Sequence, residues 1–194
     1  MWGICIQHAV GGALCLPALI PSAFPSVSHS LALSLTRWGA LSEVAFEVTD
    51  SLKRIYQRCF LDNGAELQPN ALLFLLFCHH SLSTLLVVPT NVLYSEFDVN
   101  DTRTASKYRI AYPEMVFSMQ AAAAFAVLIQ QYTQALDIKK SSASLTKMFY
   151  LSLVSLIVMA YTRGIHYWWC VYRLLYIVRD EGHTGNDTKV YSDV

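Results

Sequence analysis

Two adjacent histidines stand at the centre of an apolar stretch and are the residues best suited to do chemistry. His79 and His80 lie within residues 71–94, ALLFLLFCHHSLSTLLVVPTNVLY. Because imidazole titrates near neutral pH, one ring could act as a general base on a hydroxyl or an amine while the other orients it. Ser83 and Thr84 follow one helical turn later, within hydrogen-bonding reach. We therefore predict that His79 and His80 are catalytic and that Ser83 and Thr84 contact the substrate.

The same stretch predicts a membrane helix, since about 18 apolar residues are enough to cross the hydrocarbon core of a bilayer. An ionisable side chain inside a membrane is costly unless it faces a protein interior or a wet cavity, so it marks a functional site. The alternative is a buried helix of a soluble protein with two hydrogen-bonded histidines.

The composition favours the membrane. Hydrophobic residues make up 54% of the chain and charged residues only 14%, against about 25% charged in an average soluble domain. The 14 basic and 14 acidic residues cancel, which removes any general attraction to nucleic acid. We therefore predict no nucleic-acid partner. The five cysteines are scattered and never form a C-x-x-C pair, so we interpret them as apolar core residues.

The apolar stretches predict an all-α protein, a multi-pass transmembrane helical bundle with four or five spans. The four main spans are expected at residues 31–56, 71–94, 112–136 and 148–178. The chain then divides into an N-terminal apolar segment (1–30), which is either a further membrane helix or a targeting segment, a transmembrane domain (31–178) and a polar tail (179–194).

Prolines and glycines suggest where these helices begin, end and bend. Pro17, Pro21 and Pro25 should break the helix after Cys15, and a second helix should start near Ser30. The histidine helix should end near Pro89, and Pro113 should stand at the start of the next, with Glu114 in the first turn. The last apolar stretch would measure about 46 Å as a helix at 1.5 Å per residue, so it must tilt or bend near Arg163 and Gly164.

A polar stripe runs along the helix expected at 31–56. Glu43, Glu47, Asp50 and Arg54 recur at spacings of four, three and four, so they share one face. For an isolated stripe we favour a solvated face over the polar lining of a bundle, and the opposite charges of Asp50 and Arg54 fit both.

Four motifs occur in order along the chain: FEVTD (46–50), LFCHHSLSTLL (76–86), PEMVFSMQ (113–120) and YTRG (161–164). Together they resemble the TLC domain, a family of multi-pass membrane proteins that includes ceramide synthases, translocating-chain-associating proteins and lipid-homeostasis proteins. The resemblance covers roughly residues 41–178. The chain lacks the aspartate pair of the ceramide synthases, so the resemblance does not imply ceramide synthesis.

The resemblance implies that Asp50, His79, His80, Glu114 and Arg163 line an interior cavity. We accordingly predict a lipid-binding set beside the histidine pair: Asp50, Ser83, Thr84, Glu114 and Arg163. An unpaired arginine in the membrane would be destabilising by at least about 2.5 kcal/mol, so Arg163 should neutralise Glu114 or Asp50.

Coordination is an alternative use of the histidines. His79 or His80 with Asp50 and Glu114 would make a mixed nitrogen and oxygen set for a divalent metal, and a membrane histidine could also be an axial ligand of a haem or chlorin. A third alternative is simple hydrogen-bonded packing. No standard metal-site spacing is present, so we predict no metal and no cofactor, and His166, among aromatic residues, is interpreted as interfacial.

These observations lead to one functional hypothesis and two alternatives. The protein is expected to bind, move or modify a lipid of an intracellular membrane, which by the resemblance would be the endoplasmic reticulum. The main alternative is a non-catalytic structural or accessory subunit of a larger membrane complex, and the other is a helper of protein insertion. Whether the protein is an enzyme stays open.

Overall fold

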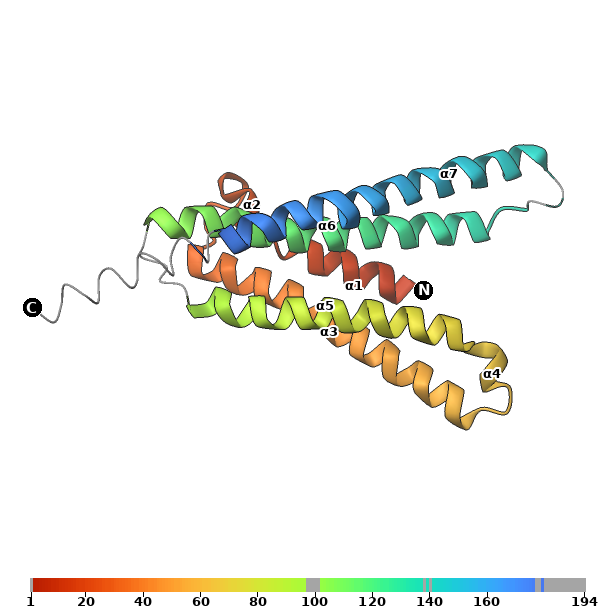
Figure 1. Cartoon of the computed structure of the whole chain (residues 1–194). Helices are drawn as coiled ribbons and strands as arrows, with labels where there is room; N and C mark the ends of the chain where they lie inside the picture. The colour runs from red at the N-terminus through yellow and green to blue at the C-terminus, as the bar shows by residue number, and fades with distance from the viewer. Residues whose placement is uncertain (1, 97–101, 138, 140, 177–178, 180–194) are drawn as a thin grey trace, which may run out of the picture. The chain divides into compact units, whose positions relative to one another are not determined.

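The computed structural model describes residues 2–96, 102–137, 139, 141–176 and 179. All regular structure in these ranges is helical, so the prediction of an all-α protein is confirmed for them (Figure 1). The polar tail expected at 179–194 lies, apart from Arg179, outside the described residues.

The described residues form five long helices and several short helical segments. The elements are α1 (Trp2–Ala13), α2 (Leu16–Leu19), the 3₁₀ turn η1 (Pro21–Ala23), α3 (His29–Phe60), α4 (Gly64–Leu67), α5 (Asn70–Glu96), α6 (Thr102–Gln134), α7 (Ser142–Ala160) and the π-helix η2 (Tyr161–His166). The last helix then continues to Tyr176 as an α-helix.

The chain separates into two compact units. The larger unit contains the described residues of 1–39 and 98–194, and the smaller unit contains residues 40–97, so the boundary falls inside α3. The larger unit therefore holds α1, α2, the start of α3, α6, α7 and η2. The smaller unit holds the rest of α3 with α4 and α5.

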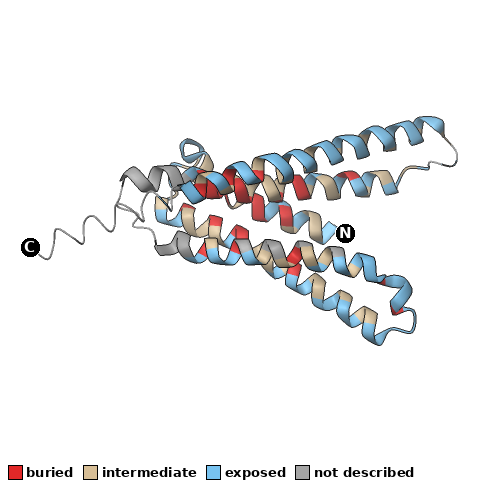
Figure 2. Ribbon diagram, in the orientation of Figure 1, coloured by how far each residue is buried: buried red, intermediate tan, exposed pale blue. Residues whose placement is uncertain are grey.

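In the larger unit α6 is the central helix. α1 and α2 pack against it, and α7 and η2 pack against it as well. Figure 2 shows that buried residues gather on α1 and α6, whereas α7 has no buried residue. The N-terminal apolar segment, which we left open as a membrane helix or a targeting segment, is thus part of this unit's core.

A buried glutamine joins three helices of the larger unit. Gln120, on α6, is only 2% exposed. Its Oε1 lies 2.8 Å from Nδ1 of His8 on α1, and its Nε2 donates a 3.1 Å hydrogen bond to the carbonyl oxygen of Gly39 on α3. Buried polar groups need such partners, so this network fixes the helices to one another in one register.

Small residues let the same helices approach closely. A Cβ added to Gly12 would lie 3.3 Å from Cβ of Gln120, and one added to Gly39 would collide with the carbonyl oxygen of Gly11. Ala122 and Ala123, within the alanine run of α6, are buried. These two small side chains therefore pack within the chain.

Three helices among the described residues are long and apolar enough to cross a membrane. They are Trp2–Leu19, Ile110–Gln134 and Ser142–Tyr176. α3, where we expected a span at 31–56, is not one of them, because charged residues such as Glu43, Glu47, Asp50 and Arg54 lie along it. The described part of the chain thus supports three spans rather than the four or five that we predicted.

Prolines mark the helix boundaries only in part. α1 ends at Ala13 and α3 begins at His29, close to the positions predicted. Pro89 and Pro113, however, lie inside α5 and α6, so the predicted helix end and helix start at these residues are wrong. A proline removes one backbone donor, and membrane helices tolerate that loss where neighbouring groups satisfy the freed carbonyl.

The smaller unit is a helical hairpin closed by polar side chains. Arg54 donates from Nε to Oδ2 of Asp50 at 2.6 Å and from Nη1 to Oε1 of Gln68 at 3.2 Å. Gln68, just after α4, also donates to Oε1 of Gln57 at 2.9 Å. These bonds tie the end of α3 to the turn that leads into α5.

The polar stripe of α3 is not the solvated face that we favoured. Glu43 and Glu47 are buried, at 8% and 2% exposure, while Asp50 and Arg54 are partly buried. The correction follows from the polar groups that surround the stripe. Thr84, on α5, donates to Oε2 of Glu47 at 3.5 Å. A buried carboxylate is retained where such donors offset the loss of water.

Candidate functional site

The structure describes half of the predicted histidine pair. His80 is buried, and its Nδ1 lies 2.8 Å from Oγ of Ser51 on α3. The side chains of His79 and Ser83 lie outside the part of the chain that the structure describes. For His80 the hydroxyl holds the ring in a fixed orientation, which both a packed histidine and a catalytic one require.

A small apolar pocket adjoins Ser51 in the smaller unit. Its volume is about 270 Å³, and it is lined by Ser51, Arg54, Ile55, Leu73, Phe74, Leu76 and Phe77. Asp50, which we predicted to bind lipid, is held by Arg54 through a 2.6 Å ion pair. The charge of the Asp50 carboxylate is therefore balanced by an arginine of the same helix.

A second polar cluster lies in the larger unit, between α6 and the last helix. Oε2 of Glu114 accepts a 2.8 Å hydrogen bond from Nη1 of Arg173, and Oε1 of Glu114 lies 3.5 Å from Nε2 of His166. His166 Nε2 in turn lies 3.6 Å from Sγ of Cys170. We call Glu114, His166, Cys170 and Arg173 the acid–imidazole cluster.

The acid–imidazole cluster opens into an apolar pocket between α6 and the last helix. The pocket holds about 500 Å³. Its lining consists of Glu114, Phe117, Ser118, Ala121, Ala122, Phe125, Val158, Tyr161, Thr162 and His166. Glu114 and His166 are thus both cluster members and pocket walls, whereas the rest of the lining is mainly hydrocarbon. A pocket that is apolar with a few polar groups at one place is the usual form of a small-molecule site.

A π-helical turn brings the cluster residues to this wall. Residues Tyr161–His166 form η2, after which the α-helix resumes, and single π-turns inside α-helices occur often at functional sites. This segment contains Arg163 and Gly164, where we expected a bend. His166, Cys170 and Arg173 then follow at spacings of four and three, so they lie on one face of the helix.

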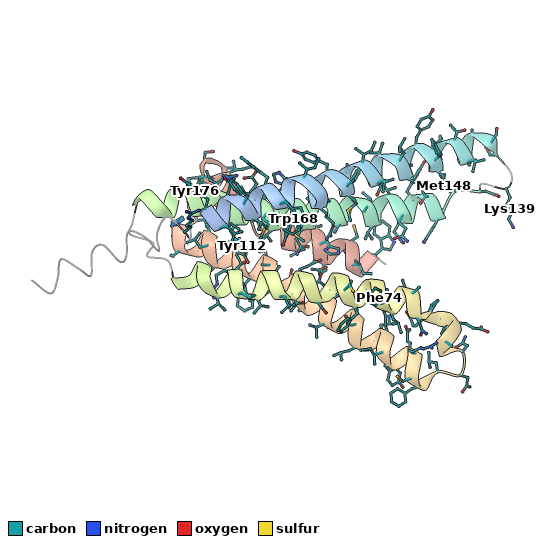
Figure 3. The ribbon with its side chains drawn as sticks, viewed as in Figure 1. Phe74, Tyr112, Lys139, Met148, Trp168 and Tyr176 are labelled. Carbon is teal, nitrogen blue, oxygen red and sulfur yellow. The ribbon has the colours of Figure 1, made fainter. Side chains whose placement is uncertain are left out.

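Figure 3 locates this part of the molecule along the helix pair. Tyr112, on α6, and Trp168, on the last helix, lie along the same half of the pair, away from Lys139 and Met148 near the connecting loop. Glu114 and His166 are each two residues from these labelled side chains. The acid–imidazole cluster therefore lies far from the connecting loop, in the half of the last helix that is rich in aromatic residues.

Arg163 does not have the partner that we predicted. Glu114 is bonded by Arg173, ten residues further along the chain, and Asp50 is bonded by Arg54. The Nε of Arg163 is buried without a hydrogen-bond partner among the described residues. The prediction failed because Arg173, and not Arg163, lies on the side of the last helix that contacts Glu114 on α6.

Three cluster residues were not among the sites predicted from the sequence. His166 was interpreted as interfacial, Cys170 as a core residue, and Arg173 was not considered. The signal that pointed to them is the pattern H-x-x-x-C-x-x-R at 166–173, which places all three on one helical face. Glu114 was predicted, although with a different arginine.

The predicted residues fall into the two units. His80, Thr84 and Asp50 belong to the smaller unit, whereas Glu114 and Arg163 belong to the larger unit. Each site is therefore defined by the residues of its own unit.

The resemblance to the TLC domain stays a prediction from its motifs, because no protein family, no curated protein and no solved structure matches the chain.

Proposed function

We propose that this chain is an integral membrane protein that binds, moves or modifies a lipid, and that the lipid occupies the pocket between α6 and the last helix. The observation that carries the proposal is the joining of a 500 Å³ apolar pocket to a charged cluster on two helices that are long enough to cross a membrane. A lipid has the same division into an apolar chain and a polar headgroup.

The depth of the cluster supports this orientation of the lipid. Glu114 is four residues inside the apolar span that begins at Ile110, and Arg173 is five residues from Val178, where the last apolar stretch of the sequence ends. At 1.5 Å per residue, both lie within about 8 Å of the end of their apolar stretches. The headgroup would therefore contact the cluster near the membrane surface, and the chain would lie along Phe117, Ala121 and Phe125.

The surroundings of the last helix fit a lipid environment. Large apolar side chains such as Phe149, Leu156 and Ile165 are more than half exposed. Clustered aromatic residues, including Trp168 and Trp169, follow in the second half of the helix, as is common at the headgroup level. An apolar surface of this extent is normally covered by lipid or by a protein partner.

The histidine pair, in the smaller unit, is the reaction centre in this proposal if the lipid is modified. Its support is the burial of His80 and its 2.8 Å contact with Ser51, which hold the imidazole in place beside a small apolar pocket. The TLC-like motifs around it add the expectation of lipid chemistry. The membrane in which this would occur stays the predicted endoplasmic reticulum.

Native mass spectrometry of the full chain, extracted gently from its own membrane, tests the proposal. We expect the wild type to retain one lipid class, and we expect Ala121→Trp, which fills the pocket, to lose it. Leu128→Trp is the matched control, because Leu128 lies on the same helix, is 47% exposed and does not line the pocket.

Two results would contradict the pocket. One is equal lipid retention by Ala121→Trp and the wild type. The other is a wild type that carries stoichiometric protein chains and no specific lipid, which would favour the alternative of an accessory subunit. Loss of the lipid in His80→Ala with retention in Ala121→Trp would place lipid binding in the smaller unit instead.

A further inference from the structure

Three side chains of the acid–imidazole cluster offer three different metal-ligand atoms to one point. A carboxylate oxygen of Glu114, a ring nitrogen of His166 and Sγ of Cys170 all lie within 4.8 Å of one another. His166 Nε2 lies 3.5 Å from Oε1 of Glu114 and 3.6 Å from Sγ of Cys170.

These distances match the edges of a tetrahedral zinc site. With zinc bonds of about 2.0 to 2.1 Å to nitrogen and oxygen and about 2.3 Å to sulfur, a tetrahedral angle separates N and O by about 3.4 Å and N and S by about 3.6 Å. Both edges that include His166 therefore have the length that zinc needs, and the third, from Glu114 to Cys170, is under 4.8 Å and closes to about 3.6 Å when the ion binds. A set of one thiolate, one imidazole and one carboxylate suits zinc better than magnesium or calcium, which prefer oxygen ligands alone.

Arg173 would act as an outer partner of such a site. It donates to Oε2 of Glu114 at 2.8 Å and leaves Oε1 directed to His166. Outer hydrogen bonds of this kind orient the ligand atom that faces the metal. A carboxylate and a thiolate offset the two positive charges of zinc, so that the site together with Arg173 carries one net positive charge.

The position of the ligands decides which face of the ion stays open. Cys170 is fully buried, whereas Glu114 and His166 line the 500 Å³ pocket. Three protein ligands leave a fourth tetrahedral position free, as in zinc sites that bind water or a substrate. We propose that Glu114, His166 and Cys170 bind one zinc ion whose fourth position faces this pocket, where it takes an oxygen donor.

The inference goes beyond lipid binding and is tested without a lipid. The full chain, purified in detergent and stripped with a chelator, is titrated with Co²⁺ as a spectroscopic substitute for zinc. We expect one ion per chain, visible d–d bands of tetrahedral cobalt and a near-ultraviolet thiolate-to-cobalt charge-transfer band. Zinc added afterwards should remove these bands.

Variants assign the ligands. Cys170→Ser should abolish the charge-transfer band, and His166→Gln and Glu114→Gln should each weaken cobalt binding about tenfold or more. Cys59→Ser and Glu66→Gln are the matched controls, because both residues are exposed and lie in the smaller unit. Both should bind cobalt like the wild type.

The wild type alone keeps the proposal falsifiable if a variant fails to fold. A wild-type spectrum without a thiolate-to-cobalt band overturns it, and so does a band that persists in Cys170→Ser. Loss of the band in Cys59→Ser would also overturn it, since the thiolate would then belong to another cysteine. Lipid retention measured by mass spectrometry is independent of these results, so failure of the zinc site and failure of the proposed function are distinguishable.

Discussion

Arg173 and Glu114, 59 residues apart in the chain, form an ion pair in which Nη1 donates to Oε2 at 2.8 Å. The pair joins α6 to the last helix, and both side chains are about 30% exposed. Arg163, on the same helix, has a buried Nε without a partner among the described residues. Arg173 therefore links two helices through an ion pair, whereas the Nε of Arg163 makes no such bond among the described residues.

Replacing each arginine by leucine separates these roles. Arg173→Leu leaves Glu114 without its strongest partner, so we expect the free energy of unfolding to fall by about 1 to 3 kcal/mol. Arg163→Leu removes a cation for which the described residues show no ion pair and whose Nε is buried without a hydrogen-bond partner among them, so we expect no loss or a small gain in stability. Thermal unfolding in detergent measures both. A larger loss in Arg163→Leu than in Arg173→Leu would contradict this assignment.

Gln120 is the polar centre of the larger unit, and its removal should be costly. Gln120→Leu keeps the volume but leaves the ring of His8 and the carbonyl of Gly39 without this buried partner. We expect a loss of about 1 to 3 kcal/mol in unfolding free energy. Gln130→Leu, at an exposed position of the same helix, is the control and should change stability by less than about 0.5 kcal/mol. Equal losses in the two variants would disprove the role of the network.

The fold class and several helix positions could be predicted from the sequence because they depend on local patterns. Apolar runs of sufficient length gave the helices, and Pro17 and Pro21 ended the first one. Pro89 and Pro113 misled us because the cost of a proline inside a helix is only a few kcal/mol and can be offset by tertiary packing. A local pattern cannot show that offset.

The candidate site was harder to predict, since it depends on which helices meet. Glu114 was predicted through the resemblance to the TLC domain, but its partner could be identified only from the packing of the last helix against α6. The π-turn at Tyr161–His166 changes the helical register just before His166 and Cys170, and no residue pattern in the sequence announced it.

Ser51 and His80 should be energetically coupled if their 2.8 Å contact holds the ring in place. We expect Ser51→Ala to cost about 1 kcal/mol of stability. We also expect the loss in the Ser51→Ala, His80→Ala double variant to differ from the sum of the single losses by at least about 0.5 kcal/mol.

Thr49→Ala is the control for this double-mutant cycle, because the Thr49 hydroxyl donates to the carbonyl oxygen of Ala45 on its own helix. Its combination with His80→Ala should be additive. Additivity in the Ser51 cycle would mean that the contact contributes nothing.

The glycines of the larger unit should respond to alanine in opposite directions. A Cβ at Gly39 would collide with the backbone carbonyl of Gly11, and a carbonyl oxygen cannot turn aside as a flexible side chain can. Gly39→Ala should therefore destabilise the chain by about 1 to 3 kcal/mol. Gly3 has nothing within 4 Å of an added Cβ, so Gly3→Ala should be neutral or raise stability by up to about 1 kcal/mol through helix propensity. Thermal unfolding of the two variants in the same detergent measures the difference, and a Gly39→Ala protein as stable as Gly3→Ala would show that α1 and α3 do not approach this closely.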